Sequence, residues 1–348
     1  MNFASDNTAP VAPGVMDALV AANSGASTAY GADDESDRAR QRLCEIFDAD
    51  CAVYLLASGT AANSLGLAAA TPPHGALLCS DVAHIHLDEC GAPEFFTGGA
   101  KCQALPALSG KLVPGVLQAH LTERPLLGPH RSPYKVLSLT QGTEAGTVYT
   151  VSELQALSAA AREHQLMVHM DGARFANAVV ASGASPADLT WRAGVDMLSF
   201  GGTKNGCMAA EALIVFNRDL EGDIDYLRKR AGHLWSKGRY LGAQLNGYLR
   251  DSYWLTLAAH ANAMAKRLSE GLRTIPGVKL IYPTEINEVF VSMPQTLVTE
   301  LQLAGASFYP WVCPGLPPSA GAYRLITSWN THEKEVDQFL AIAHSVTE

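Results

Sequence analysis

Residues 52–70 have the sequence AVYLLASGTAANSLGLAAA, in which an apolar run, a small polar turn and a helix-forming segment follow one another. The apolar run 52–57 is typical of a buried strand. It stops at Ser58-Gly59-Thr60, and residues 61–70 then favour a helix. Strand, tight turn and helix in this order form the repeating unit of α/β proteins.

The same alternation continues through the first two thirds of the chain. A capping-box pattern at residues 152–155 predicts a helix that extends to about residue 164. Further strands are predicted at 136–139, 165–170, 196–200 and 212–216. Because strands separated by helices need crossover connections, we expect an α/β fold with a mainly parallel sheet, helices on both faces and ligands at the carboxyl ends of the strands.

The pattern changes at about residue 250. A long helical segment, 254–272, leads into strand-like runs and a proline-rich loop at 310–318. The strand-like runs are 278–282, 289–293 and 323–329. Thr331 is the expected N-cap of a final amphipathic helix. We therefore predict a large domain, 1–250, with an N-terminal arm, and a smaller α+β domain, 251–348.

Composition and charge exclude several classes of protein. Apolar residues make up 48% of the 348 residues and charged residues 17%, which predicts a compact protein rather than a disordered one. The net charge of −9 disfavours nucleic acid and anionic membranes as partners. The seven cysteines lack the spacing of a zinc site, and no apolar stretch has the length of a membrane span or a signal peptide. We expect a cytoplasmic protein with reduced thiols and no bound metal.

Three positions at predicted strand ends have side chains suited to chemistry. Ser58-Gly59-Thr60 would present N–H groups and hydroxyls to an anion such as phosphate at a helix N-terminus, unless it is an ordinary turn with an N-cap. Asp171 ends a predicted strand, where a carboxylate could keep a heterocyclic nitrogen protonated, although Asp-Gly is also a common turn. Lys204 follows another strand, and its amine would be a nucleophile if buried, whereas a solvated loop lysine is the more ordinary interpretation.

The order of these features is more informative than each one alone. A phosphate turn, then His84, then Asp171 and then Lys204 are the parts of a pyridoxal phosphate site. The segments that resemble a known family are ASDN (4–7), YG (30–31), SGTAANS (58–64), AH (83–84), DECGA (88–92), HMDGARF (169–175) and GGTKNG (201–206). Along nearly its whole length the chain resembles the low-specificity L-threonine aldolases, which belong to the fold-type I pyridoxal phosphate enzymes and the β-eliminating lyase group.

The resemblance implies pyridoxal 5′-phosphate as the cofactor. It implies that Lys204 is the Schiff-base lysine, that Asp171 pairs with the pyridine nitrogen, and that His84 stacks on the ring and takes part in the chemistry. The other cofactor-binding residues that it implies are Ser58, Gly59, Thr60, Arg174 and Arg239.

The resemblance also implies the substrate site and the assembly. Ser5, Arg174 and Arg324 match the residues that bind the substrate α-carboxylate, and a guanidinium fork suits that anion. Tyr30, a further substrate-binding candidate, and Arg239 match residues that reach a neighbouring subunit's site. The active unit would then be at least a dimer, and the family is usually a homotetramer.

The implied reaction breaks the Cα–Cβ bond of L-threonine, L-allo-threonine or another β-hydroxy-α-amino acid and gives glycine and an aldehyde. A phenylserine-preferring aldolase and a related β-eliminating lyase are the rival enzymes. A non-catalytic protein that kept the fold is the rival from another class.

One departure from the family pattern leaves the general base open. Many members have a histidine in an Asn-Thr-His segment, but residues 140–146 of this chain are TQGTEAG. His84, acting directly or through water, is the first candidate, and Glu144 is the second. His86 is expected to be a structural or outer residue.

Overall fold

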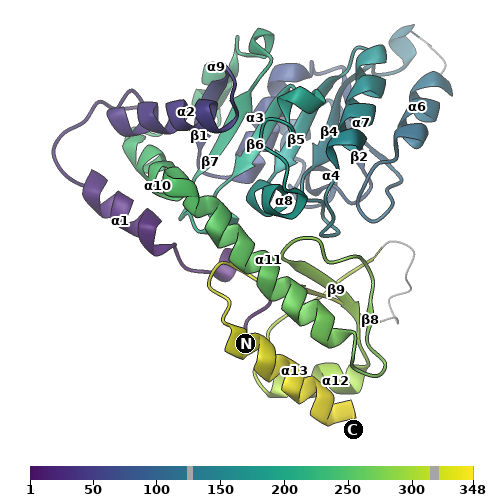
Figure 1. Cartoon of the computed structure of the whole chain (residues 1–348). Helices are drawn as coiled ribbons and strands as arrows, with labels where there is room; N and C mark the ends of the chain where they lie inside the picture. Colours follow the sequence, from purple (N-terminus) through teal and green to yellow (C-terminus); the bar gives the residue numbers. More distant parts are fainter. Residues whose placement is uncertain (124–127, 314–320, 348) are drawn as a thin grey trace.

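The computed structural model describes residues 1–123, 128–313 and 321–347, and it contains two β-sheets with helices packed on them (Figure 1). The strands are β1 (Ala52–Leu56), β2 (Ala76–Ser80), β3 (Lys101–Leu105), β4 (Tyr134–Thr140), β5 (Met167–Gly172), β6 (Met197–Gly201), β7 (Glu211–Val215), β8 (Lys279–Leu280), β9 (Glu288–Ser292), β10 (Tyr309–Pro310) and β11 (Ala322–Ile326). The helices are α1 (Pro13–Ala22), α2 (Asp34–Ile46), α3 (Gly59–Ala70), α4 (His84–Leu87), α5 (Ala92–Phe96), α6 (Pro114–Glu123), α7 (Val151–Glu163), α8 (Phe175–Ser182), α9 (Ile224–Arg230), α10 (Arg239–Leu249), α11 (Tyr253–Leu272), α12 (Gln295–Leu303) and α13 (Glu333–Thr347).

The larger sheet confirms the predicted α/β fold. Its order is β1-β7-β6-β5-β4-β2-β3, and all neighbouring pairs are parallel except those that include β7. Side chains alternate between two cores: Leu55 packs in a core with α2, α7, α8 and α10, whereas Leu56 packs with α3 and α9 on the other face. Both faces of the sheet are therefore buried under helices, as expected for parallel strands.

The carboxyl ends of the parallel strands meet at one edge of this sheet. Thr140 at the end of β4 is the register partner of Asp171 in β5, and Asp171 is the partner of Ser199 in β6. The turn at Ser58, which follows β1, and the turn at Lys204, which follows β6, lie at the same edge. The fold thus brings together strand ends that are far apart in the sequence.

The smaller sheet is antiparallel, with the order β10-β11-β9-β8, and α11, α12 and α13 pack against it. The N-terminus joins this part of the molecule, because the buried ring of Phe3 lies 5.3 Å from that of Phe339 in α13. Figure 1 shows both chain termini in this lower part of the view. The domain boundary at residue 250 stays a prediction.

Two predicted helix starts differ from the structure, one by two residues and the other by one. The capping box of α7 is formed by Thr150 and Glu153, so the helix begins earlier than residues 152–155 indicated. The helix α13 begins at Glu333, and the Thr331 hydroxyl instead accepts the N–H of Ser328 at 2.9 Å. Of the predicted loop 310–318, Pro310 belongs to β10, and residues 314–318 lie outside the described residues.

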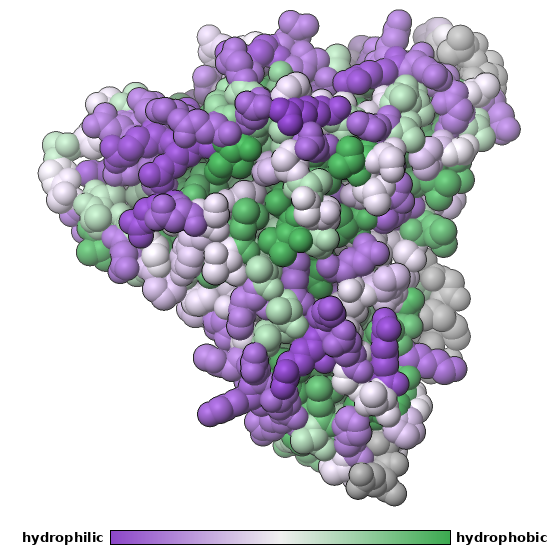
Figure 2. Space-filling model, in the orientation of Figure 1, coloured by the Kyte–Doolittle hydropathy of each residue, from purple (hydrophilic) through white to green (hydrophobic). Residues whose placement is uncertain are grey.

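The surface agrees with this layering. Figure 2 shows a hydrophilic outer face on α2, whose inward residues Ala39 and Leu43 are fully buried. Among the described residues, none of the helices combines the length and the apolar character that crossing a membrane would demand.

Candidate active site

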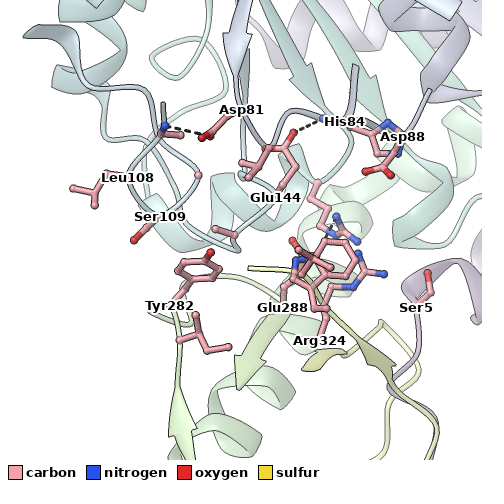
Figure 3. Close-up of a pocket in the computed structure, with 18 of the residues that line it drawn as sticks. Ser5, Asp81, His84, Asp88, Leu108, Ser109, Glu144, Tyr282, Glu288 and Arg324 are labelled. Atoms are coloured by element: carbon pink, nitrogen blue, oxygen red, sulfur yellow. Dashed lines mark hydrogen bonds and ion pairs between the residues drawn. The ribbon is translucent and has the colours of Figure 1, made fainter. Parts of the chain in front are cut away.

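Two cavities meet at the carboxyl edge of the larger sheet. The inner cavity, of about 280 Å³, is lined by Asn7, Ala57, Ser58, Gly59, Thr60, Asn63, His84, Glu89, Thr140, Gly142, Glu144, Asp171, Ala173, Arg174, Thr203, Lys204 and Glu211. The outer cavity, of about 560 Å³, is lined by Ser5, Asn7, Asp81, Val82, His84, Asp88, Ala107, Leu108, Ser109, Gly110, Glu144, Ala145, Arg174, Lys204, Ile281, Tyr282, Glu288, Trp311, Val312 and Arg324. In Figure 3, His84 and Glu144 lie on the side of the larger sheet and Tyr282 and Arg324 on the side of the smaller one.

The turn after β1 closes one end of the inner cavity. Ser58 is the N-cap of α3, and its hydroxyl accepts the N–H of Ala61 at 3.3 Å. A Cβ added at Gly59 would meet no atom within 4 Å, so open space lies against the backbone there. The first N–H groups of a helix have no partner within the helix, and this turn therefore offers an anion site.

Asp171 is held from both of its carboxylate oxygens. Its Oδ1 accepts the N–H of Ala173 at 2.9 Å, and its Oδ2 accepts the side-chain N–H of Asn63 at 2.8 Å. Below it on β5, the ring of His169 lies between the hydroxyls of Ser138 and Ser199. Burial lowers the pKa of His169 to about 4 although the charge of Asp171 opposes this, so the ring under Asp171 is neutral at neutral pH.

His84 contacts two acidic residues in different ways. Its ring Nδ1 lies 2.9 Å from Oε1 of Glu89, and its backbone N–H donates to Oε1 of Glu144 at 2.9 Å (Figure 3). The hydrogen bond with Glu89 is the main reason that the pKa of His84 is raised. Burial raises the pKa of Glu144 to about 7, and the hydroxyl of Thr140 donates to the same Oε1 at 2.8 Å.

Lys204 lies in a short 3₁₀ turn directly after β6 and lines both cavities. Within the described ranges, its ammonium has no hydrogen bond or ion pair. Glu211 fixes the turn, because its carboxylate accepts the N–H of Gly202 at 2.9 Å and that of Thr203 at 3.4 Å. The amine of Lys204 is thus positioned by its backbone while its nitrogen stays available.

The two predicted carboxylate-binding arginines line the outer cavity together. Arg174 donates to both oxygens of Asp6, at 2.8 and 3.1 Å, and its NH1 lies 3.4 Å from Glu288. The guanidinium of Arg324 lies over the ring of Trp311, with its central carbon 4.0 Å from the ring centroid. Buried Glu288 is a counter-charge to both arginines, which oppose the rise that burial causes in its pKa.

Ser5 also lines the outer cavity, and its hydroxyl accepts the N–H of Asn7 at 3.1 Å. Tyr30 and Arg239 line neither cavity. Tyr30 is half exposed, and Arg239 donates to the carbonyls of Ala22, Ser24 and Gly25. They nevertheless lie in adjoining segments, because the N–H of Tyr30 donates to the carbonyl of Ser236 at 3.0 Å. His86 is exposed and lines neither cavity.

Several buried polar residues of the site were not predicted to have a role. They are Asp6, Asn63, Glu89, His169, Glu211 and Glu288. A polar residue inside an otherwise apolar segment, such as Asn63 in α3 or Glu211 at the start of β7, is a signal that the sequence does contain. Their partners are not visible there, because Arg174 and Asp6 are separated by 168 positions.

The residues of the inner cavity fit pyridoxal 5′-phosphate, the cofactor that the resemblance implies. Open space in front of Gly59 and the N-terminus of α3 would accept the phosphate. Asp171 would pair with the pyridine nitrogen, His84 would cover the ring, and Lys204 has a nitrogen available for the aldehyde.

Comparison with known proteins shows what the whole chain is similar to. Residues 2–296 match the family model described as β-eliminating lyase. The chain is 43% identical to the low specificity L-threonine aldolase of Pseudomonas aeruginosa, over 96% of this chain and 94% of the relative. It is 42% identical to the enzyme of the same name from a Pseudomonas species, over 99% and 97%. The solved structure of Leishmania major threonine aldolase superimposes with a TM-score of 0.92 at 30% identity and covers 100% of this chain and 99% of that one.

Proposed function

This chain belongs to the β-eliminating lyase family, and from that premise we propose that it is a pyridoxal phosphate-dependent aldolase. Its substrates are L-threonine, L-allo-threonine and other β-hydroxy-α-amino acids, and its products are glycine and an aldehyde. One observation carries the proposal: Lys204, Asp171 and the N-terminus of α3 line one cavity, and two arginines line the cavity that adjoins it.

The inner cavity binds the cofactor in this proposal. Bound pyridoxal 5′-phosphate supplies an electron sink for the electron pair that the broken Cα–Cβ bond leaves behind. Ser58, Gly59 and Thr60 hold the phosphate, Lys204 holds the aldehyde end covalently, and Asp171 keeps the ring nitrogen protonated. Because the oxygens of Asp171 are fixed by two N–H donors, its carboxylate needs no rearrangement to do this.

The outer cavity binds the amino acid. Arg174 and Arg324 bind the α-carboxylate with the Ser5 hydroxyl beside them. Asp6 and Glu288 already engage Arg174, so its guanidinium is oriented before substrate arrives. Fixing the carboxylate turns the Cα–Cβ bond into the orientation in which it breaks.

His84 takes the proton of the substrate β-hydroxyl. Its Nδ1 is engaged by Glu89, which leaves Nε2 as the nitrogen that can accept a proton. Glu144 is less suited to this step, because its Oε1 already accepts two hydrogen bonds and its Oε2 is shielded from solvent.

The proposed enzyme is a cytoplasmic homo-oligomer with shared active sites, a dimer of dimers. The position of Tyr30 and Arg239 supports this part of the proposal. Both lie away from the cavities of their own chain, in adjoining segments, and Tyr30 is half exposed with the Lys229 ammonium over its ring. The exposed ring of Tyr30 is available to a neighbouring subunit, and Arg239 lies in the segment beside it.

A second candidate is an aldolase that prefers β-aryl substrates such as phenylserine. The outer cavity is twice as large as the inner one and has Tyr282, Trp311 and Leu108 in its walls. Apolar and aromatic walls favour a large side chain on the substrate β-carbon.

Product analysis tests both candidates and their rivals. The purified chain, supplied with cofactor, is incubated with L-threonine, L-allo-threonine and phenylserine in parallel. We expect glycine with acetaldehyde or benzaldehyde, and Lys204→Ala removes both products. Ammonia with a 2-keto acid would instead identify a β-eliminating lyase, and no cleavage of any substrate would identify a non-catalytic protein.

A further inference from the structure

A fully buried carboxylate connects two residues of the proposed site. The side chain of Glu89 is 0% exposed, and its Oε1 accepts a side-chain N–H of Asn63 at 2.8 Å and lies 2.9 Å from Nδ1 of His84. The same nitrogen of Asn63 donates to Oδ2 of Asp171 at 2.8 Å. A continuous chain of hydrogen bonds therefore runs from Asp171 through Asn63 and Glu89 to His84.

The local fold does not explain this carboxylate. Glu89 precedes α5 but does not cap it. The N-cap of that helix is Gly91, and no side chain forms a capping hydrogen bond there. The second oxygen of Glu89, Oε2, is buried and has no hydrogen-bond partner among the described residues. Burying a carboxylate with an unsatisfied oxygen is costly, and an apolar residue would fill the same space at lower cost. Among the described residues, the side-chain hydrogen bonds of Glu89 reach only Asn63 and His84, and these are the residues that it can position.

We propose that Glu89 is a positioning residue, which holds the His84 ring with its proton on Nδ1 so that Nε2 accepts the proton of the substrate hydroxyl. This inference rests on the proposed function in assigning that proton to His84. In the step, the substrate O–H bond breaks and an Nε2–H bond forms. The cationic ring that results lies beside the Glu89 carboxylate, and the Nδ1 proton stays on the ring.

Asn63 has a separate part in the arrangement. Its amide group has two N–H bonds, and each is directed at a different carboxylate, Asp171 on one side and Glu89 on the other. The two carboxylates are thereby fixed in relation to each other without sharing a proton. Asp171, which would pair with the cofactor nitrogen, and Glu89, which would orient the base, are thus joined through one side chain.

Glu89→Gln tests the proposal, because a glutamine oxygen can still accept both bonds while the charge is lost. The readout is the pH dependence of carbethoxylation of His84 in the full-length protein with cofactor, measured by peptide mass spectrometry. Only the neutral ring reacts, so the midpoint reports its proton affinity. We expect the midpoint to fall by about one pH unit, since an adjacent opposite charge favours the protonated ring. His86, two residues away, is the reference site in the same peptide.

The matched control is Glu94→Gln, which removes a charge from the same segment but from a side chain with no hydrogen bond to His84. In Glu94→Gln, the pH midpoint of His84 carbethoxylation should stay at the wild-type value. In Glu89→Gln we also expect kcat for L-threonine to fall at least about tenfold with KM nearly unchanged. Equal midpoints in wild type and Glu89→Gln would overturn the proposal, and so would equal shifts in both variants.

Nuclear magnetic resonance of the wild type keeps the proposal testable if Glu89→Gln does not fold. In ¹⁵N-histidine-labelled protein, the His84 signal is identified by its loss in His84→Asn. At a pH above the pKa of His84, the proposal predicts a neutral ring with the proton on Nδ1, and a neutral ring with the proton on Nε2 would overturn it. Neither the carbethoxylation midpoint nor the nuclear magnetic resonance signal depends on turnover. A protein that cleaves no β-hydroxy amino acid would therefore refute the proposed function, whereas these two measurements would still decide whether Glu89 positions His84.

Discussion

Asp6→Ala should destabilise the protein because it removes one member of a buried ion pair. Asp6 and Arg174 have side-chain exposures of 2% and 11%, and two hydrogen bonds of 2.8 and 3.1 Å join them. In the variant, Glu288, at 3.4 Å, is the one ion-pair partner that Arg174 keeps among the described residues. Leaving a buried charge without its main partner costs about 3–5 kcal/mol of unfolding free energy. For a chain of 348 residues, that corresponds to a decrease in Tm of roughly 4–7 °C.

Scanning calorimetry at fixed protein and cofactor concentration measures this change. Asp188→Ala is the matched control, because Asp188 also pairs with an arginine, Arg192 at 3.2 Å, but both side chains are exposed. The control should leave Tm unchanged, since surface ion pairs contribute little. Equal Tm values for the two variants would refute the reasoning. Asp6→Ala should also raise KM for L-threonine, because Arg174 loses the carboxylate that orients it.

The pH dependence of the Tm difference between wild type and Asp6→Ala follows from the charges around Asp6. Burial alone would raise the pKa of Asp6, but the positive charges of Arg174 and Lys204 outweigh it and hold the pKa below the ordinary 3.8. A carboxylate whose pKa is lowered by folding contributes its full stabilisation when the pH is above its ordinary pKa. That contribution is lost as the pH falls through the lowered pKa of the folded state. The Tm gap between wild type and Asp6→Ala should therefore be constant from about pH 5 to 8 and shrink only in stronger acid. A gap that narrows above pH 5 would contradict the lowered pKa.

Three further changes test other parts of the site. Asp171→Ala should lower kcat at least about a hundredfold, because the ring nitrogen loses its anionic partner, and near-normal turnover would refute that role. Glu144→Gln should leave the ionisation of the proposed base, His84, in the kcat/KM profile, and loss of an ionisation near pH 7 would assign it instead to Glu144, whose pKa burial raises to about 7. Arg324→Lys should raise KM for the amino acid about tenfold and change kcat less, because an ammonium lacks the guanidinium fork. A lower kcat at unchanged KM would contradict the clamp.

The strand, turn and helix at residues 52–70 were predictable because their signals are local. The predicted strand 52–57 and helix 61–70 correspond to β1 (Ala52–Leu56) and α3 (Gly59–Ala70). The direction of β7 was not predicted, because the alternation of apolar runs does not show which way a strand enters the sheet. β7 follows β6 after a short connection and runs antiparallel to it, so it places Glu211 next to Gly201.

The candidate site also contains residues that could be predicted from the local sequence and residues that could not. Lys204 and Asp171 could be singled out because each ends an apolar strand, and parallel strands end at one edge of a sheet. The ion pair of Arg174 with Asp6 and the hydrogen bonds of Asn63 join distant segments, and single-sequence patterns contain no information on such pairs. The strand β2 and the edge strand β3 were also missed, and the placement of the N-terminal residues on the smaller sheet was missed because it too joins distant segments.

Reductive trapping at Lys204 is the most direct test of the proposed chemistry. The full-length protein is mixed with pyridoxal 5′-phosphate, treated with sodium borohydride, digested and sequenced by mass spectrometry. We expect one pyridoxyl-modified lysine, Lys204, and no modification in protein pretreated with hydroxylamine. An unmodified Lys204, or a label spread over the surface lysines, would show that this cavity does not hold the cofactor covalently.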